Sequence, residues 1–142
     1  MTAKKVFVLD TSALFAFMQN EPGADRMEQI LRSARQRGCT VYVSFISLAE
    51  LYYVSWQEAG RSAALEMIVH VKALPLSVVE STERLTLLAG SIKANHHCSL
   101  ADAFIAATAL QVGGTLVHKD PEIEQVNGII STEKLPYKTS TR

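Results

Sequence analysis

Short apolar runs alternate along this chain with longer segments whose apolar residues recur every three or four positions. The short runs are rich in β-branched and aromatic residues, which is typical of buried strands. We expect strands at 6–9, 41–43, 76–79 and 115–117 and a last edge strand at 128–130. The helical spacing predicts helices from 11 to 18, from after 23 to about 37, from 47 toward 60, and at 62–74, 82–95 and 100–112.

Alternation of strands and helices indicates a mostly parallel sheet covered by helices, because a parallel connection needs a crossover segment that packs back onto the sheet. We therefore predict an α/β fold, a three-layer α/β/α sandwich with a mostly parallel central sheet. The chain has 142 residues, of which 48% are hydrophobic and 20% charged, as in ordinary globular domains. This length is usual for one domain, so we expect a single domain over residues 1–142.

The charge balance limits how this protein could bind a polyanion. Lys plus Arg equals Asp plus Glu, at 14 each, so the surface has no excess of positive charge with which to hold nucleic acid. A nucleic-acid substrate would need a local groove. No apolar stretch approaches the roughly 18 residues of a membrane span, and the first residues lack the apolar core of a signal peptide. We expect no membrane contact and a cytoplasmic location.

Four acidic residues stand where a predicted strand ends or inside an apolar helical segment: Asp10, Glu50, Asp102 and Asp120. An unpaired buried carboxylate is costly, and two of them about 4 Å apart repel by roughly 4 kcal/mol at an effective dielectric near 20. Such groups bind either protons or a cation. Sites gather at the carboxyl ends of parallel strands, which would bring together Asp10, Glu50 and Asp120. This argument does not place Asp102, whose helix precedes a strand.

A cluster of carboxylates without His or Cys suits Mg²⁺ or Mn²⁺ and suits zinc poorly. A metal held in this way activates a bound water and stabilises charge on a phosphoryl oxygen, so phosphodiester hydrolysis is the natural reaction class. The sequence has no GxxxxGK[ST] phosphate loop and no GxGxxG fingerprint, which removes the usual nucleotide-binding alternatives.

Each acid also has a purely structural interpretation. Residues 47–50 and 99–102 both fit the helix capping box [ST]-x-x-[DE], which would account for Glu50 or Asp102 alone. Asp10 could be an N-cap, and Asp120 before Pro121 a turn residue. Taken together, the four acids favour a shared site over four separate structural roles.

Other polar and aromatic residues receive structural interpretations. Residues 96–98, His-His-Cys, are expected to form a polar loop rather than a soft-metal site. His118 and Lys119 flank Asp120, and we expect a solvated rim there. The aromatic residues of 52–56 are expected in core packing or a protein interface rather than in base stacking. Ser12 could hydrogen-bond a carboxylate or a metal-bound water, or cap a helix.

Four segments in their order and spacing carry a family resemblance: Val8–Leu14, Ser47–Leu51, Leu100–Ala107 and Leu116–Asp120. With them, almost the whole chain resembles a PIN-domain ribonuclease of the small VapC-like toxin kind. The resemblance implies that the four acids are the catalytic and metal-binding set, with Ser12 as a supporting hydroxyl, and it brings Asp102 into the site. Glu122 and Glu124 follow Asp120 closely and could share or replace its role.

Proteins of this kind hydrolyse RNA with Mg²⁺ or Mn²⁺, form homodimers and are held inactive by a cognate antitoxin protein. The resemblance therefore implies a metal-dependent endoribonuclease, the toxin of a toxin–antitoxin pair. The alternatives are a PIN-domain nuclease of RNA processing and a catalytically silent PIN-like binding module. A HAD-like phosphatase is a further alternative, but such enzymes usually carry a second Asp where this chain has Ser12.

Overall fold

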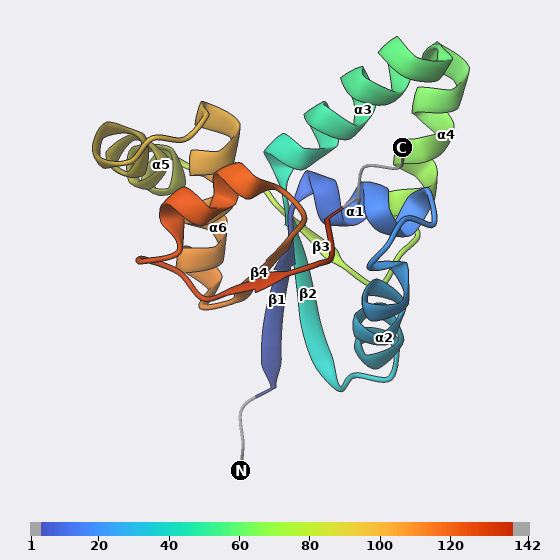
Figure 1. Cartoon of the computed structure of the whole chain (residues 1–142), viewed down its shortest axis with the longest axis horizontal. Helices are drawn as coiled ribbons and strands as arrows, with labels where there is room; N and C mark the ends of the chain where they lie inside the picture. The colour runs from blue at the N-terminus through green and yellow to red at the C-terminus, as the bar shows by residue number, and fades with distance from the viewer. Residues whose placement is uncertain (1–3, 138–142) are drawn as a thin grey trace.

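Five strands form one parallel sheet in the computed structural model, which describes residues 4–137 (Figure 1). The strands in chain order are β1 (Lys5–Leu9), β2 (Cys39–Ser44), β3 (Ser77–Val79), β4 (Thr115–His118) and β5 (Thr132–Lys134). Their order across the sheet is β3-β2-β1-β4-β5, and each neighbouring pair is parallel. The predicted α/β/α fold is confirmed.

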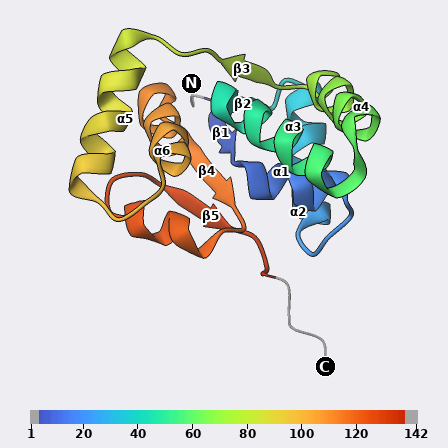
Figure 2. The same cartoon turned by 90° about the horizontal axis from the view of Figure 1, so that it is seen from above.

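Helices cover both faces of the sheet (Figures 1 and 2). They are α1 (Thr11–Met18), α2 (Ala24–Arg35), α3 (Phe45–Ala59), α4 (Arg61–Lys72), α5 (Glu83–Asn95), α6 (Leu100–Val112) and the 3₁₀ helix η1 (Pro121–Val126). One core lies between the sheet and α1, α2, α3 and α4. A second core joins the sheet to α5, α6 and η1. No helix among residues 4–137 is long and apolar enough to cross a membrane.

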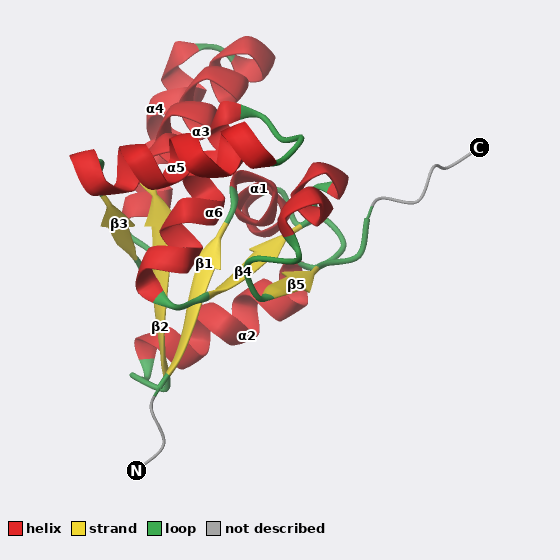
Figure 3. Ribbon diagram, turned by 90° about the vertical axis from the view of Figure 1, so that its left-hand side faces the viewer, coloured by secondary structure: helices red, strands yellow, loops and turns green. Residues whose placement is uncertain are grey.

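β1 occupies the centre of the sheet and contributes to both cores. Successive side chains of a strand point to opposite faces, so Phe7 and Leu9 pack in the first core while Val8 packs in the second. All three are at most 4% exposed. A continuous apolar run is what a strand buried on both faces requires, which explains the signal at 6–9 in the sequence. β1 then leads directly into α1 at the carboxyl edge of the sheet (Figure 3).

The prediction of a last strand at 128–130 is wrong. The 3₁₀ helix and the turn after it occupy residues 121–130, and Ile130 packs on the second core from that turn. β5 follows at Thr132–Lys134, where Leu116 pairs with Thr132. An edge strand is covered less than a central one and can be polar. The apolar run therefore marked a contact with the core and not the strand itself.

The turn between α1 and α2 depends on Gly23. Its φ of +102° lies in the left-handed region, which side chains with a Cβ rarely adopt. A Cβ at this position would also lie 3.0 Å from the Cβ of Leu135. Gly90 offers a contrast, because it lies within α5 and an added Cβ would have no neighbour within 4 Å.

The same substitution should therefore have opposite effects at these two glycines. Gly23→Ala should lower the free energy of unfolding by about 1–3 kcal/mol, because it adds backbone strain and a contact. Gly90→Ala should raise it by about 0.5–1 kcal/mol through helix propensity. Urea denaturation of the two variants measures both values. Equal effects at the two positions would contradict this account of the turn.

Candidate metal centre

Asp10 directly follows β1 and caps α1. Its backbone N–H donates to the Val117 carbonyl at 3.0 Å, which fixes it against β4. Its Oδ1 accepts hydrogen bonds from the Ala13 N–H at 2.8 Å and from the Ser12 hydroxyl at 2.7 Å. The N-cap interpretation of Asp10 is confirmed. Both bonds end on one oxygen, so capping occupies only half of a carboxylate that is 2% exposed.

Asp102 lies in the first turn of α6, where Ser99 is the N-cap and accepts the Asp102 N–H at 3.1 Å. The predicted cap at 99–102 is therefore present. Capping leaves part of the Asp102 side chain unexplained: the residue is 6% exposed, and its buried Oδ2 has no hydrogen-bond partner among residues 4–137. A buried polar atom without a partner is rare, and this oxygen has capacity to bind a ligand.

Asp120 and Glu122 stand beside Asp102 at the end of β4. Asp120 is the N-cap of η1, and its Oδ1 accepts the Glu122 N–H at 2.9 Å. One carboxylate oxygen from each of Asp102, Asp120 and Glu122 lies within 4.8 Å of the other two. Oxygen ligands of an octahedral Mg²⁺ are about 3 to 4 Å apart, so small side-chain rotations would let the three oxygens share one ion.

The pKa values of Asp10 and Asp102 are both raised, and the charge of Asp120 contributes to both shifts. Burial raises the pKa of Asp10 to about 7; the hydrogen bonds from Ser12 and Ala13 oppose this, and the negative charges of Asp120 and Asp102 add to it. Burial likewise raises the pKa of Asp102 to about 7, with the charge of Asp120 as the next contribution. Carboxylates from β1, α6 and the end of β4 thus repel one another across a common space.

Glu50 does not lie in the cluster of Asp102, Asp120 and Glu122. Its Oε1 accepts the hydroxyl of Thr11 at 2.6 Å, which holds it beside the start of α1. The capping interpretation of Glu50 is wrong, because α3 begins at Phe45 with Ser44 as its N-cap. β2 ends at Ser44, one residue beyond the predicted strand, and α3 begins two residues before the predicted helix start at 47. Glu50 therefore lies well inside the helix, adjacent to the residue that follows Asp10.

Ser12 joins the two segments that carry Asp10 and Asp120. Its hydroxyl accepts the backbone N–H of Lys119 at 2.8 Å and donates to Asp10 Oδ1 at 2.7 Å. Because the Ser12 oxygen accepts the Lys119 N–H, the hydroxyl proton of Ser12 can still be donated to the Asp10 carboxylate. Ser12 thus fixes the start of α1 against the loop after β4.

The expectation that His118 and Lys119 form a solvated rim is wrong. His118 is 1% exposed, burial lowers its pKa, and its Nδ1 accepts the Asp120 N–H at 3.3 Å. The Lys119 side chain is 6% exposed, and its Nζ contacts Glu21 Oε1 at 3.2 Å and the Pro22 carbonyl at 2.8 Å. The residues after the apolar run of β4 continue the strand and then pack under the turn between α1 and α2.

The structure separates Glu122 from Glu124, which the sequence left equivalent as partners of Asp120. Glu122 shares the cluster with Asp102 and Asp120. Glu124 accepts the Tyr137 hydroxyl at 3.1 Å and lies 3.7 Å from Lys134 Nζ. A 3₁₀ helix has three residues per turn, so positions two apart point in different directions. This period would have distinguished the two glutamates had the short helix been recognised in the sequence.

The donor set of this site fits a hard divalent cation. The three clustered ligand atoms are all carboxylate oxygens, and Asp102 contributes a buried oxygen that has no partner within 4–137. Mg²⁺ and Mn²⁺ prefer oxygen ligands of this kind. Burial and, after it, repulsion by neighbouring carboxylates raise the pKa values of Asp10 and Asp102, and a bound cation would favour their ionised forms.

In the metal-free protein, Asp10 should make stability depend on pH. The unfolded carboxyl ionises near pH 3.8 and the folded one near 7, so its contribution to stability is full below pH 3.8 and is lost as the pH rises toward 7. Asp10→Asn keeps the capping oxygen and removes the charge. The variant should exceed wild type in unfolding free energy above pH 7 by as much as about 4 kcal/mol, since one pKa unit is about 1.4 kcal/mol.

Urea denaturation in EDTA at pH 4, 5.5 and 8 measures this difference between the Asp10→Asn variant and wild type. The difference should approach zero at pH 4 and widen toward pH 8. A difference that stays constant over this range would contradict the raised pKa of Asp10.

Comparisons with known proteins agree with this fold. A family model described as "PIN domain" matches residues 7–129. No curated protein matches the chain. Among solved structures, DNA-bound VapBC from Salmonella typhimurium superposes with a TM-score of 0.73 at 24% identity, covering 93% of this chain and 98% of that chain.

VapBC2 from Rickettsia felis, bound to a promoter DNA fragment, gives a TM-score of 0.73 at 17% identity, with 92% of this chain and 99% of that chain covered. VapC20 from Mycobacterium tuberculosis, a toxin that cleaves the sarcin-ricin loop, gives 0.66 at 19% identity, with 87% and 95% covered. These likenesses show a shared fold along nearly the whole length of each chain. The family model covers most of the sequence, and the chain belongs to the PIN domain family.

Proposed function

We propose that this protein is a metal-dependent endoribonuclease that uses Mg²⁺ or Mn²⁺, and that it is the toxin of a toxin–antitoxin pair. The observation that carries the proposal is the meeting of three carboxylates within 4.8 Å beside the buried Asp10, with one oxygen of Asp102 lacking any partner in residues 4–137. Carboxylates so placed are costly without a cation.

In the proposed site, Asp102, Asp120 and Glu122 hold the ion, and Asp10 lies against it from the end of β1. The bound ion supplies an activated water and charge stabilisation at the phosphoryl group. The hydrogen bonds from Ser12 and Ala13 orient the Asp10 carboxylate, and Thr11 holds Glu50 at the edge of the site. We retain Asp10, Glu50, Asp102 and Asp120 as the catalytic set, with Ser12 in support and Glu122 added.

Support for RNA as substrate and for an antitoxin partner comes from the relatives. VapC20 is described as cleaving the sarcin-ricin loop, and several structural neighbours were solved as VapBC complexes. We further propose a homodimer. Tyr53 and Trp56 on α3 are 50% and 47% exposed, so the aromatic residues of 52–56 suit an interface with another protein better than a core.

Two alternative functions are separated from the proposed one by experiment. A PIN-domain nuclease of RNA processing would share the same metal site, and a silent binding module would bind metal without turnover. The HAD-like phosphatase is not retained, because the chain belongs to the PIN domain family.

Asp102 and Glu122 should control metal affinity, whereas Glu124 should not. Asp102→Asn and Glu122→Gln each remove a proposed ligand, and we expect Mn²⁺ affinity to fall about 10- to 100-fold. RNA cleavage at limiting Mn²⁺ should fall at least as much. Glu124→Gln makes the same change of charge two residues away and should leave both values unchanged. Calorimetric titration of Mn²⁺ and cleavage of a structured RNA measure the two effects.

Cleavage at the wild-type rate by Asp102→Asn would contradict the proposed function. Wild-type protein that binds Mn²⁺ and cleaves no RNA would favour the silent binding module. Addition of EDTA should stop cleavage by the wild type, and restoration by Mg²⁺ is the control for loss of folded protein.

A further inference from the structure

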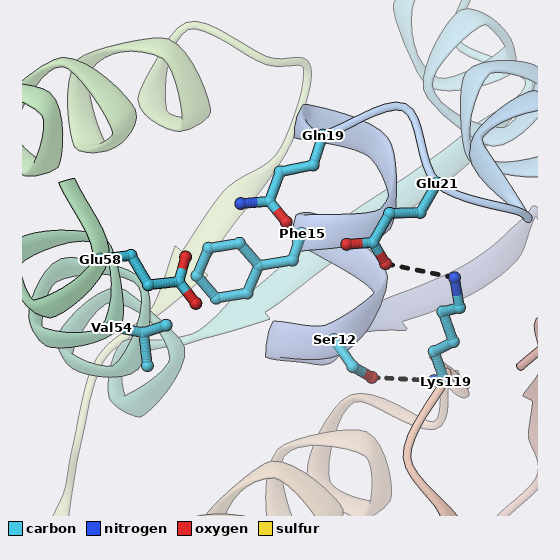
Figure 4. Close-up of a pocket in the computed structure, with 7 residues that line it drawn as sticks. All are labelled: Ser12, Phe15, Gln19, Glu21, Val54, Glu58 and Lys119. Atoms are coloured by element: carbon cyan, nitrogen blue, oxygen red, sulfur yellow. Dashed lines mark hydrogen bonds and ion pairs between the residues drawn. The ribbon is translucent and has the colours of Figure 1, made fainter. Parts of the chain in front are cut away.

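A pocket opens between α1, α3 and the loop that follows β4 (Figure 4). Its volume is about 360 Å³, which is in the range of small-ligand sites. Ser12 and Lys119 line one part of it, and Phe15, Gln19 and Glu58 line another. The metal centre described above does not use these last three residues.

Ser12 connects the wall of the pocket to the proposed metal centre. The Ser12 hydroxyl forms part of its wall and donates to Asp10, and Lys119, which also lines it, directly precedes Asp120. A phosphodiester group at the acids would therefore place a neighbouring nucleotide at the mouth of this pocket. This step rests on the proposed nuclease function.

The charges in the pocket do not favour a phosphate. Lys119 is the cation in the lining, and Glu21 and the Pro22 carbonyl already hold its ammonium group. The Glu58 carboxylate and the Gln19 carboxamide are exposed to solvent at the pocket, and neither has a hydrogen bond or ion pair to another residue of 4–137. The uncompensated charge in the lining is thus negative, and the pocket suits a ligand that brings hydrogen-bond donors.

Phe15 gives the pocket an aromatic surface. Its side chain is half-buried, and its ring lies beside both Glu58 and Gln19 (Figure 4). Unpaired bases of RNA stack on such side chains and are read along their Watson–Crick edges. Among the four RNA bases, only guanine presents two adjacent donors on that edge, N1–H and the exocyclic amino group, and a carboxylate can accept both.

We propose that this pocket binds a guanine base of the RNA at a nucleotide next to the cleaved bond. Phe15 stacks on the base, Glu58 accepts from N1–H and the amino group, and the Gln19 carboxamide bonds to a remaining polar atom. A basic side chain from a partner protein fits less well. Arginine brings donors only and could pair with Glu58 alone, whereas guanine also brings O6 and N7, which can accept from the Gln19 N–H groups.

Mononucleotide binding tests this inference without turnover, because a nucleoside monophosphate has no phosphodiester bond to cleave. The probes are guanosine, inosine and adenosine 5′-monophosphate, titrated in Mg²⁺ and followed by NMR chemical shifts. Wild type should bind the guanosine nucleotide at least about tenfold more tightly than the adenosine nucleotide, because one or two bonds to a charged acceptor are lost. The affinity for the inosine nucleotide, which lacks the amino group, should lie between those for the other two.

Two variants and a matched control assign the selectivity. Glu58→Gln should abolish the preference for the guanosine nucleotide over the adenosine nucleotide. Phe15→Leu should weaken the binding of all three nucleotides by the same factor. Glu66→Gln makes the same charge change on the exposed face of α4, outside the pocket lining, and should keep the preference. The NMR spectra also report whether each variant is folded.

Equal binding of guanosine and adenosine nucleotides by wild type would overturn the proposal, and so would selectivity that survives Glu58→Gln. Glu58-dependent binding of arginine amide without guanine selectivity would also overturn it, and would assign the pocket to a basic side chain of a partner protein. Guanine selectivity in a protein that cleaves no RNA would support the base site while refuting the nuclease. The guanine site and the nuclease function can therefore be refuted independently of each other.

Discussion

Burial and mutual repulsion both disfavour the charged forms of the carboxylates at the carboxyl edge of this sheet. Asp10 and Asp102 are 2% and 6% exposed, and each feels the negative charge of Asp120. The fold tolerates this because the groups are fixed from outside the cluster. Ser12 connects Asp10 to the backbone of Lys119, and Lys119 is anchored to the turn between α1 and α2. The ionised carboxylates thus lower the stability of the fold at a place where a divalent cation would restore it.

Capping and metal binding are compatible roles for the same side chain. Asp10 and Asp120 both cap helices, and each accepts the backbone N–H through Oδ1. A carboxylate has two oxygens with several lone pairs, so one capping bond leaves capacity for a ligand and also fixes the rotamer. The N-cap interpretation of Asp10 was therefore correct, and Asp120, expected as a turn residue, caps the 3₁₀ helix instead. Neither structural role weighs against a functional one. At Asp102 the cap is made by Ser99, and the carboxylate remains available.

The fold was predictable because its signals are local. The apolar run before Asp10 indicates a strand buried on both faces, and the helices were expected from spacing alone. The placement of Asp10 and Asp120 at strand ends followed from parallel topology. Long-range pairings were not predictable in this way. The bond between Thr11 and Glu50 spans 39 positions, and the contact of Lys119 with Glu21 spans 98, so no periodicity reveals either. The separation of Glu122 from Glu124 depends on a 3₁₀ helix whose six residues resemble a turn.

The proposed function requires this protein to bind a polyanion, RNA, although its net charge is zero and its site is acidic. The chain has equal numbers of basic and acidic residues, and Lys119, which adjoins the site, is committed to Glu21. Attraction of many phosphates over a long range is therefore weak, and affinity must come from the cation and from short-range contacts. A pocket that combines the Phe15 ring with the exposed polar groups of Gln19 and Glu58 provides contacts of that kind. Because they act on bases, the same contacts that supply affinity would also select the sequence that is cut.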